Sequence, residues 1–356
     1  MKYFWSIIIL AVGLSGCQEP IELEFTGSET NYLVVEGSIS TVFQKHQVVL
    51  SRSTPFQNNS LTNFIAEAGA SVSIISDNGS TYFFHETEEG VYKSDSAFNA
   101  VESSSYELSI VLRNGESYSS TPQLVESSGT LDGVSVGYKE ILTYNSELQS
   151  FRSKKGIELL ADFSLNSNDR YVGFDWESTF IIKSEIGPNP GKECYIPDQT
   201  PGIERLINNA GLNQTVFTEE PVSFLIYDFR FRYRYSLNLI MYGMSKETYN
   251  FHNQVLSQLN SSGSIFEANQ IQINGNIFNK NDADEVVLGN FSVFTQCEQR
   301  IFIDPASLPF QSEPFNICSR ANPNATTYIG SGAPEHCFDC LTYSPSATDI
   351  KPSFWR

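Results

Sequence analysis

The chain has 356 residues, of which 13% are aromatic and 18% charged, and its formal net charge is −19. This length suffices for about two domains with hydrophobic cores, so neither a metal nor a dense disulfide network is required for folding. The negative charge repels nucleic acid, which argues against a nucleic-acid partner, and nothing in the composition calls for a cofactor.

Residues 1–16 are typical of a lipoprotein signal peptide. Lys2 precedes an apolar stretch over 3–14 that is too short to span a bilayer permanently. Leu14-Ser15-Gly16 then leads directly into Cys17, the thiol that bacterial lipoprotein enzymes acylate. We predict lipidation of Cys17 and attachment to the membrane through this anchor; an ordinary signal peptide with a chance cysteine is the alternative. Cleavage before Cys17 would leave 340 of the 356 residues and, with Lys2 lost, change the charge from −19 to −20.

An acidic tether is predicted for residues 17–30, because 18–30 are polar and show no sustained periodicity. Over 31–126, short β-branched and aromatic runs alternate with Gly, Asn and Ser, which predicts an antiparallel sandwich of the immunoglobulin-like or transthyretin-like type. Asn78-Gly79 and Asn114-Gly115 indicate tight hairpin turns. The expected strands cover 33–37, 47–50, 70–75, 82–84, 90–92, 106–112 and 118–120.

A domain boundary is predicted at 127–130, followed by a larger, mixed, mainly-β domain over 130–356. One docked helix is expected near 245–260, capped by Ser245, and a shorter helical turn at 203–209. The predicted fold class is therefore all-β: a sandwich, then a mixed β domain with one helix and a disulfide-bonded tail. The expected strands of the second domain cover 156–164, 170–182, 222–234, 236–242, 286–294 and 300–303.

The body contains five cysteines after Cys17: Cys194, Cys297, Cys318, Cys337 and Cys340. Export would place them in an oxidising compartment where disulfides persist, and the odd number leaves at least one thiol outside intramolecular pairs. His336 beside the Cys337-x-x-Cys340 motif also suggests zinc or a redox pair. Zinc requires four ligands and a thioredoxin-type pair requires a βαβ context, so structural disulfides are favoured over a metal.

Residues 229–235 alternate aromatic and basic side chains. On a strand, Arg230, Arg232 and Arg234 would share one face and the aromatic rings the other. A core strand with salt-bridged arginines outside is one interpretation. A docking surface for a carboxylate-rich partner is the other, because guanidinium groups bind carboxylates in bidentate geometry.

Three weaker motifs allow specific chemistry. Residues 133–137 match the Gly-x-Ser-x-Gly nucleophile elbow of hydrolases, with Ser135 as the nucleophile. The flanking residues continue a β pattern, and His252 lies on the apolar face of the predicted helix. We therefore predict a strand and no enzyme. Asp282, Asp284 and Glu285 could bind calcium, yet the EF-hand spacing is absent and a solvated loop is favoured. Ser96, in Asp95-Ser96-Ala97, resembles a Bacteroidota O-glycosylation site.

The cleavage motif Leu14-Ser15-Gly16-Cys17 (the lipobox), the two-part β layout and an ordered set of short motifs resemble domain-of-unknown-function family 4249, surface lipoproteins of Bacteroidota. The motifs lie at 33–37, 69–72, 235–237, 273–277, 288–291, 300–303, 337–340 and 351–355. The resemblance implies a cell-surface protein encoded beside a TonB-dependent outer-membrane receptor, with no known catalysis. It also implies that Cys297 is the odd thiol and that Cys194 and Cys318 each pair with one of Cys337 and Cys340. A direct Cys337–Cys340 bond is the competing arrangement.

We therefore expect a non-enzymatic lipoprotein of the outer membrane, exposed on the cell surface, that acts as an accessory subunit of a TonB-dependent receptor or another outer-membrane complex. The alternative is a lipoprotein that captures a glycan, a peptide or a metal chelate for uptake. An exported hydrolase is a third, weaker possibility, because the sequence shows no convergent triad, acid pair or metal set.

Overall fold

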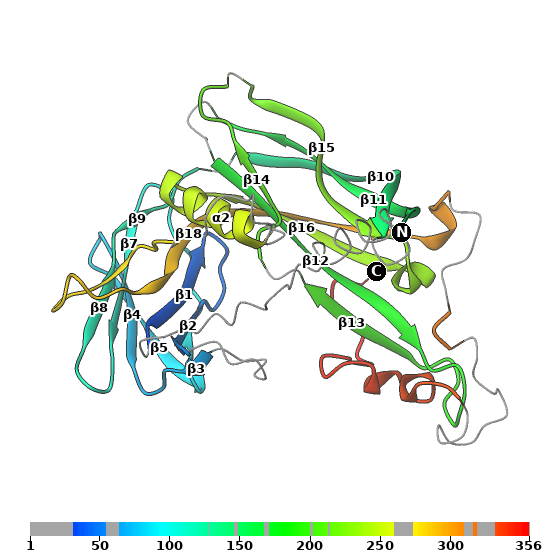
Figure 1. Cartoon of the computed structure of the whole chain (residues 1–356), viewed down its shortest axis with the longest axis horizontal. Coiled ribbons are helices and arrows are strands. Elements are labelled where there is room, and N and C mark those ends of the chain that lie inside the picture. Colours follow the sequence, from blue (N-terminus) through cyan, green and yellow to red (C-terminus); the bar gives the residue numbers. More distant parts are fainter. Residues whose placement is uncertain are drawn as a thin grey trace, which may run out of the picture.

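The structure, a computed structural model, describes residues 31–54, 64–127, 129–145, 149–166, 171–199, 202–212, 214–259, 273–309, 316–318 and 332–355. The signal peptide, Cys17 and the tether lie outside these residues. Strands dominate the described chain, and α2 (Lys246–Leu259) is its α-helix, so the all-β fold class is confirmed (Figure 1). No described helix is both long and apolar enough to cross a membrane.

The N-terminal region is a sandwich-like stack of strands around one hydrophobic core. Alternate side chains of its strands point inward, as Val72 and Ile74 do, while their neighbours face outward. The predicted turns form with Gly79 at φ 87° and Gly115 at φ 91°, where glycine carries no steric penalty. The strands are β1 (Leu33–Ser40), β2 (Gln47–Ser53), β3 (Phe64–Ala66), β4 (Ser71–Ser76), β5 (Thr81–Glu88), β6 (Val91–Ser94), β7 (Ser105–Val111), β8 (Ser117–Ser120) and β9 (Gln123–Leu124).

The chain returns to this core much later in the sequence. Strand β17 (Ile277–Asn279) pairs with β8, and the first half of β18 (Leu288–Ile303) runs parallel to β1. Ile277, Val287, Phe291 and Val293 are buried in the same cluster as the β1, β4 and β7 side chains. The sandwich is thus not purely antiparallel, because a strand arriving after a long crossover can pair in either direction. Residues expected in the second domain complete the first core.

The second region is also built from two packed sheets. One sheet contains β10 (Thr130–Asn145), β11 (Ser150–Ser164) and β15 (Val216–Ile226). The other contains β12 (Tyr171–Lys183), β13 (Glu193–Gln199), β14 (Arg205–Asn208), β16 (Tyr235–Gly243) and the second half of β18. Phe163 of β11, Phe174 of β12 and Leu239 of β16 are fully buried between them. Strand β18 therefore belongs to both halves and joins them through continuous hydrogen bonding (Figure 1).

The helix and the C-terminal Trp355 pack on the outer face of the β12–β16 sheet, whereas Cys340 of the tail belongs to the core between the two sheets. The predicted cap forms, since the Ser245 hydroxyl accepts a hydrogen bond from the Thr248 amide at 3.2 Å. The helix packs through Tyr249 on Tyr171. Further along the sheet, Trp355 packs with Ile181 and Tyr195. The described residues of the tail form an isolated β-bridge between Thr348 and Tyr195 and three short 3-10 turns: η2 (Pro305–Ser307), η3 (Glu335–Cys337) and η4 (Cys340–Thr342).

Two local predictions are wrong. The strand expected over 222–234 ends at Ile226, and η1 (Phe229–Arg232) follows, because the Asp228 carboxylate accepts the Arg230 amide at 3.0 Å and turns the chain. The helical turn expected at 203–209 is strand β14, which pairs with the edge of β12. In the second case tertiary pairing overrides local preference.

Candidate functional site

A cavity of about 360 Å³ opens beside η1 in the second region. It lies where β12, β13, η1 and the residues just after η4 meet. Its size falls at the lower end of the range for small-molecule sites. The lining residues are Phe180, Ile196, Pro197, Asp198, Asp228, Phe229, Arg230, Tyr343 and Ser344.

Three aromatic rings form the apolar wall of this pocket. Phe180 contacts Phe229 edge-on with 6.1 Å between ring centroids, and Tyr343 completes the group at 6.0 Å from Phe180 and 6.3 Å from Phe229. Phe180 is buried, whereas Phe229 and Tyr343 are partly exposed. Burial raises the pKa of the Tyr343 phenol, so its hydroxyl remains a hydrogen-bond donor at neutral pH.

An ion triad forms the polar wall. The Arg230 Nε and Nη2 atoms donate to the Asp228 carboxylate at 3.0 Å each, and Nη1 donates to Asp198 Oδ2 at 2.8 Å. Burial alone would disfavour the charged guanidinium, but these hydrogen bonds and charges outweigh it and raise the pKa of Arg230. Two carboxylates against one guanidinium leave a net charge of −1. The fixed triad offers acceptors and donors side by side.

A disulfide holds the tail in place to complete the pocket. Cys194 of β13 is bonded to Cys340 of η4, and the Cys340 amide donates to Ser184 Oγ at 3.0 Å. Lys192 adds ion pairs to Asp339 at 3.2 Å and Asp349 at 3.4 Å. Tyr343 follows Cys340 by one turn, so the Cys194–Cys340 bond fixes the ring against Phe180.

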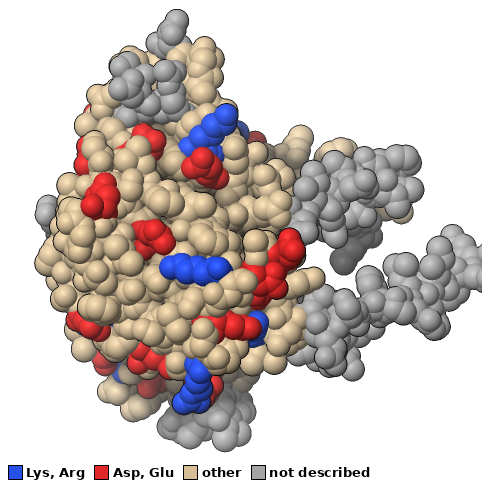
Figure 2. Space-filling view, turned by 90° about the vertical axis from the view of Figure 1, so that its left-hand side faces the viewer, with Lys and Arg blue, Asp and Glu red and all other residues tan. Residues whose placement is uncertain are grey.

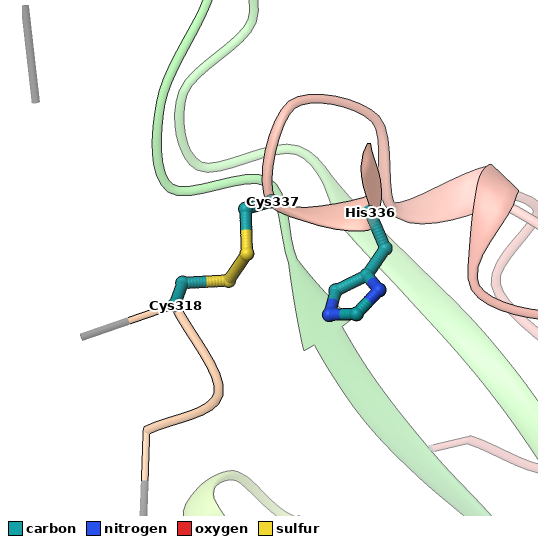
Figure 3. A group of neighbouring side chains, drawn as sticks. All are labelled: Cys318, His336 and Cys337. Atoms are coloured by element: carbon teal, nitrogen blue, oxygen red, sulfur yellow. A yellow bond between two sulfur atoms is a disulfide. The ribbon is translucent and has the colours of Figure 1, made fainter. Parts of the chain in front are cut away.

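The second disulfide joins Cys318 to Cys337, with the imidazole of His336 beside it (Figure 3). Cys337 and Cys340 therefore bond to different partners, as the family resemblance implied. Cys297 belongs to neither bridge, and its sulfur lies 3.7 Å from the Gly129 carbonyl oxygen. Within the described residues, the two clusters with metal-ligand spacing are Cys318-His336-Cys337 and Cys194-Asp339-Cys340. Both rely on sulfur atoms that the disulfides already use, so neither fits a zinc ion.

The family model described as domain of unknown function DUF4249 matches residues 18–300. The chain belongs to the DUF4249 family. The matched residues include β12, β13 and η1 of the pocket, whereas Tyr343 and the motifs at 337–340 and 351–355 follow the matched segment. A comparison with curated proteins finds no match.

The single face predicted for Arg230, Arg232 and Arg234 on a strand does not form. Only Arg230 enters the pocket; Arg232 lies 3.8 Å from Glu185 and near the Tyr233 ring, and Arg234 stacks over Phe302 at 4.5 Å. The turn at η1 sends the three side chains in different directions, so they share no face. An Asp directly before Phe-Arg, which is a helix-capping signal, could have revealed this turn.

Other candidate residues of this DUF4249 protein are not brought together. Ser135 is exposed in the middle of β10 opposite Leu160, and His252 packs against Phe294 under the helix. Ser96 is exposed in a bend after β6, where glycosylation stays a prediction.

The acidic loop after β17 does not gather its carboxylates. Glu285 accepts hydrogen bonds from the Tyr118 hydroxyl at 2.9 Å and from the Asn279 amide, so it braces β8 and β17. Asp282 accepts the Asp284 backbone amide at 3.1 Å, and both side chains are exposed. These acids are not among the described groups whose ligand atoms cluster within 4.8 Å. The solvated-loop interpretation fits this arrangement.

The pocket residues Phe180, Asp198, Asp228 and Tyr343 were not identified from sequence. They come from four separate segments, and no spacing rule connects them. The only sequence signal was indirect: Cys340 precedes Tyr343 by three residues, and its partner Cys194 precedes Asp198 by four. The Cys194–Cys340 disulfide brings Asp198 and Tyr343 to the same place.

Proposed function

We propose that this protein is a non-enzymatic lipoprotein, anchored through Cys17 in the outer membrane and exposed on the cell surface, that acts as an accessory subunit of a TonB-dependent receptor. The lipobox, the disulfides and membership of the DUF4249 family support this proposal. The pocket at Arg230 is the observation that carries it further, because it favours an accessory subunit that captures a ligand.

The chemistry of the pocket defines a ligand class. Rings of Phe229 and Tyr343 offer an apolar wall, while Asp198, Asp228 and Arg230 offer acceptors and donors in a fixed arrangement. Such a combination suits a compact ligand with one apolar face and several hydroxyl groups, as a sugar ring has. A nucleic acid or other polyanion is disfavoured by the net negative charge of the triad.

A hydrolytic function receives no support from the described residues. Ser135 is exposed on a strand, and the His252 imidazole lies against Phe294 and Phe251. A nucleophile needs a base within hydrogen-bond reach, so this serine lacks the environment that activation requires. We accordingly propose binding without turnover.

Mild solubilisation of outer membranes tests the accessory role. The full lipoprotein should co-purify with a TonB-dependent receptor at a constant stoichiometric ratio. Recovery of the lipoprotein alone, together with hydrolytic activity that Ser135→Ala abolishes, would replace this proposal with an exported enzyme.

Thermal-shift and calorimetric screening of residues 18–356 against mono- and oligosaccharides tests the capture role. For a sugar that binds, Asp198→Asn should weaken binding about tenfold or more, as expected when a charged hydrogen-bond partner is removed. Glu220→Gln, which alters an ion pair with Arg205 outside the pocket, is the matched control and should leave binding unchanged. Equal losses in both variants would exclude the pocket as the binding site.

A further inference from the structure

The far end of the β10–β11 hairpin carries apolar and basic side chains that neither core uses. We propose that this hairpin tip, defined as Leu142, Tyr144, Phe151 and the basic residues Lys139, Arg152, Lys154 and Lys155, docks onto an anionic membrane surface. The surface meant is a lipid bilayer whose headgroups carry phosphate. This inference is independent of the Arg230 pocket.

Strand pairing makes the tip a two-stranded ribbon. Strand β15 pairs with β11 only from Gly156 to Ser164, whereas β10 and β11 pair with each other as far as Asn145 and Ser150. Residues 139–145 and 150–155 therefore extend past the edge of the three-stranded sheet. An isolated ribbon of this kind gains little from core burial, so its exposed apolar groups need another explanation.

The apolar side chains of the tip share one face. Tyr144 and Phe151 are directly opposite in the register, and their rings meet edge-on with 5.3 Å between centroids. Leu142, two residues from Tyr144, points to the same side of the ribbon. Leu142 is 72% exposed, Phe151 70% and Tyr144 58%. Three large side chains thus form one exposed apolar face.

The charge of the tip is opposite to that of the rest of the chain. Residues 139–155 contain four basic and two acidic residues, a net charge of +2. The remaining residues together carry −21, which gives the whole chain its net charge of −19. Arg152, Lys154 and Lys155 are exposed and make no ion pair with the described residues, while Lys139 pairs with Glu158. By contrast, on the sandwich face in Figure 2, Asp and Glu outnumber Lys and Arg.

This arrangement matches an end-on approach of the ribbon to the interfacial zone of a bilayer, because the register places Lys155 on the apolar face and Arg152 and Lys154 on the opposite face. Aromatic rings and Leu are favourable at the boundary between headgroups and acyl chains, while Lys and Arg extend long stems towards the phosphates. Each basic residue near an anionic leaflet strengthens binding several-fold. A stable protein interface buries about 800 Å² on each partner, far more than three side chains provide, so we favour a bilayer over a protein partner.

Vesicle flotation of residues 18–356, which include every described residue and lack the acylated cysteine, tests the proposal. The protein should bind vesicles of equal parts phosphatidylglycerol and phosphatidylethanolamine at low ionic strength, and should not bind phosphatidylcholine vesicles. The double change Lys154→Glu and Lys155→Glu should reduce binding about tenfold or more, as should Leu142→Ser combined with Phe151→Ser. Absence of binding by the unaltered chain would overturn the proposal.

Exposed aromatic residues on the acidic sandwich provide matched controls. Phe43 is 72% exposed and Phe83 61%, so Phe43→Ser and Phe83→Ser remove comparable apolar area away from the tip. Both variants should bind vesicles like the unaltered chain, and equal losses would overturn the assignment to the tip. Tyr144→Trp should show a blue-shifted emission with anionic vesicles, whereas Phe43→Trp should not.

Protein occupants of the tip are distinguished in the same experiment. All variants change exposed side chains, so each should fold, and circular dichroism checks this. If the tip variants float with vesicles normally but alter the oligomeric state or the yield of a receptor complex, the occupant is a protein and the membrane proposal is wrong.

Discussion

The two halves of the molecule are stabilised by different means. The sandwich contains no disulfide among its described residues and is stabilised by a continuous core to which β18 contributes from the other end of the sequence. The second region has its own core, but its tail, described as short 3-10 turns and one isolated β-bridge, is held by two disulfides. Covalent bonds are therefore found where regular hydrogen bonding is scarce, and long-range strand pairing is found where it is abundant.

Removing the disulfides should sharpen this contrast most. Cys194 and Cys340 are 146 residues apart and Cys318 and Cys337 only 19. Loop-closure entropy then predicts losses of about 5 kcal/mol for the Cys194→Ser/Cys340→Ser pair and about 3 kcal/mol for Cys318→Ser/Cys337→Ser. Urea unfolding measures both losses. Hydrogen exchange in β4 and β7 should remain slow in either variant, and loss of that protection would contradict the separation of the two halves.

The next largest effect should come from the returning strand. Phe291 of β18 is fully buried in the sandwich core, so Phe291→Ala should reduce the free energy of unfolding by about 3–5 kcal/mol. Exchange in β4 and β7 should accelerate although the change lies far along the chain. Phe278→Ala, at a ring 43% exposed on the same returning segment, should cost much less. A sandwich that stays fully protected in Phe291→Ala would show that residues 31–126 are self-sufficient.

A third test concerns how closely β18 approaches β1. Gly289 and Gly115 both have φ 91°, so alanine carries a similar backbone penalty of about 1–2 kcal/mol at either position. A methyl group at Gly289 would lie 2.0 Å from the Val35 carbonyl oxygen, whereas nothing lies within 4 Å at Gly115. Gly289→Ala should therefore cost about 1–3 kcal/mol more than Gly115→Ala in thermal unfolding. Equal costs would contradict the close parallel pairing of the two strands.

Sequence reasoning succeeded where structure is local. Alternating side chains and Asn-Gly turns predicted β4, β5, β7 and β8, and Ser245 marked the helix start. It failed where distant segments meet. β18 was expected as two runs because polar residues from Gln296 to Gln299 interrupt its pattern, yet pairing with β16 makes the strand continuous.

The pocket was beyond sequence reasoning for a related physical reason. Its wall needs β12 beside β13, the turn at Asp228 and the disulfide to Cys340 at the same time. The Phe-Arg alternation after Asp228 is compatible with a strand by periodicity alone, and only the capping hydrogen bond decides for a turn. Topology, not local pattern, brings Tyr343 next to Phe180.

The smallest predicted difference between the halves is their response to pH. The sandwich buries His46, whose Nε2 lies 3.0 Å from the Phe98 carbonyl oxygen, and burial lowers the pKa of this imidazole. The second region holds Asp175 on β12, where burial, opposed by the Trp176 amide and assisted by the charges of Glu204 and Glu177, raises the pKa of the carboxyl to about 7. The lowered pKa of His46 reduces the stability of the fold at acidic pH. The raised pKa of Asp175 reduces it at neutral and higher pH.

The sign of each effect follows from proton binding. Below pH 6.5 the unfolded chain protonates His46 while the folded chain resists, so sandwich stability falls on acidification. Between about pH 4 and 7 the folded chain retains the Asp175 proton that the unfolded chain releases, so stability of the second region falls as pH rises. His252, whose pKa burial lowers to about 4, acts like His46 and offsets Asp175 on the acidic side.

Asp175→Asn should therefore stabilise the protein at pH 8 relative to pH 5.5 by about 1 kcal/mol, which is below the unscreened value of about 2 kcal/mol because the carboxyl is partly solvated. Urea unfolding at the two pH values measures this difference, and exchange in β12 locates it. If Asp175→Asn shifts neither the free energy nor the exchange of β12, the carboxyl is ionised in the folded protein at neutral pH. The pH responses of the two halves would then be set by their histidines and would run in the same direction.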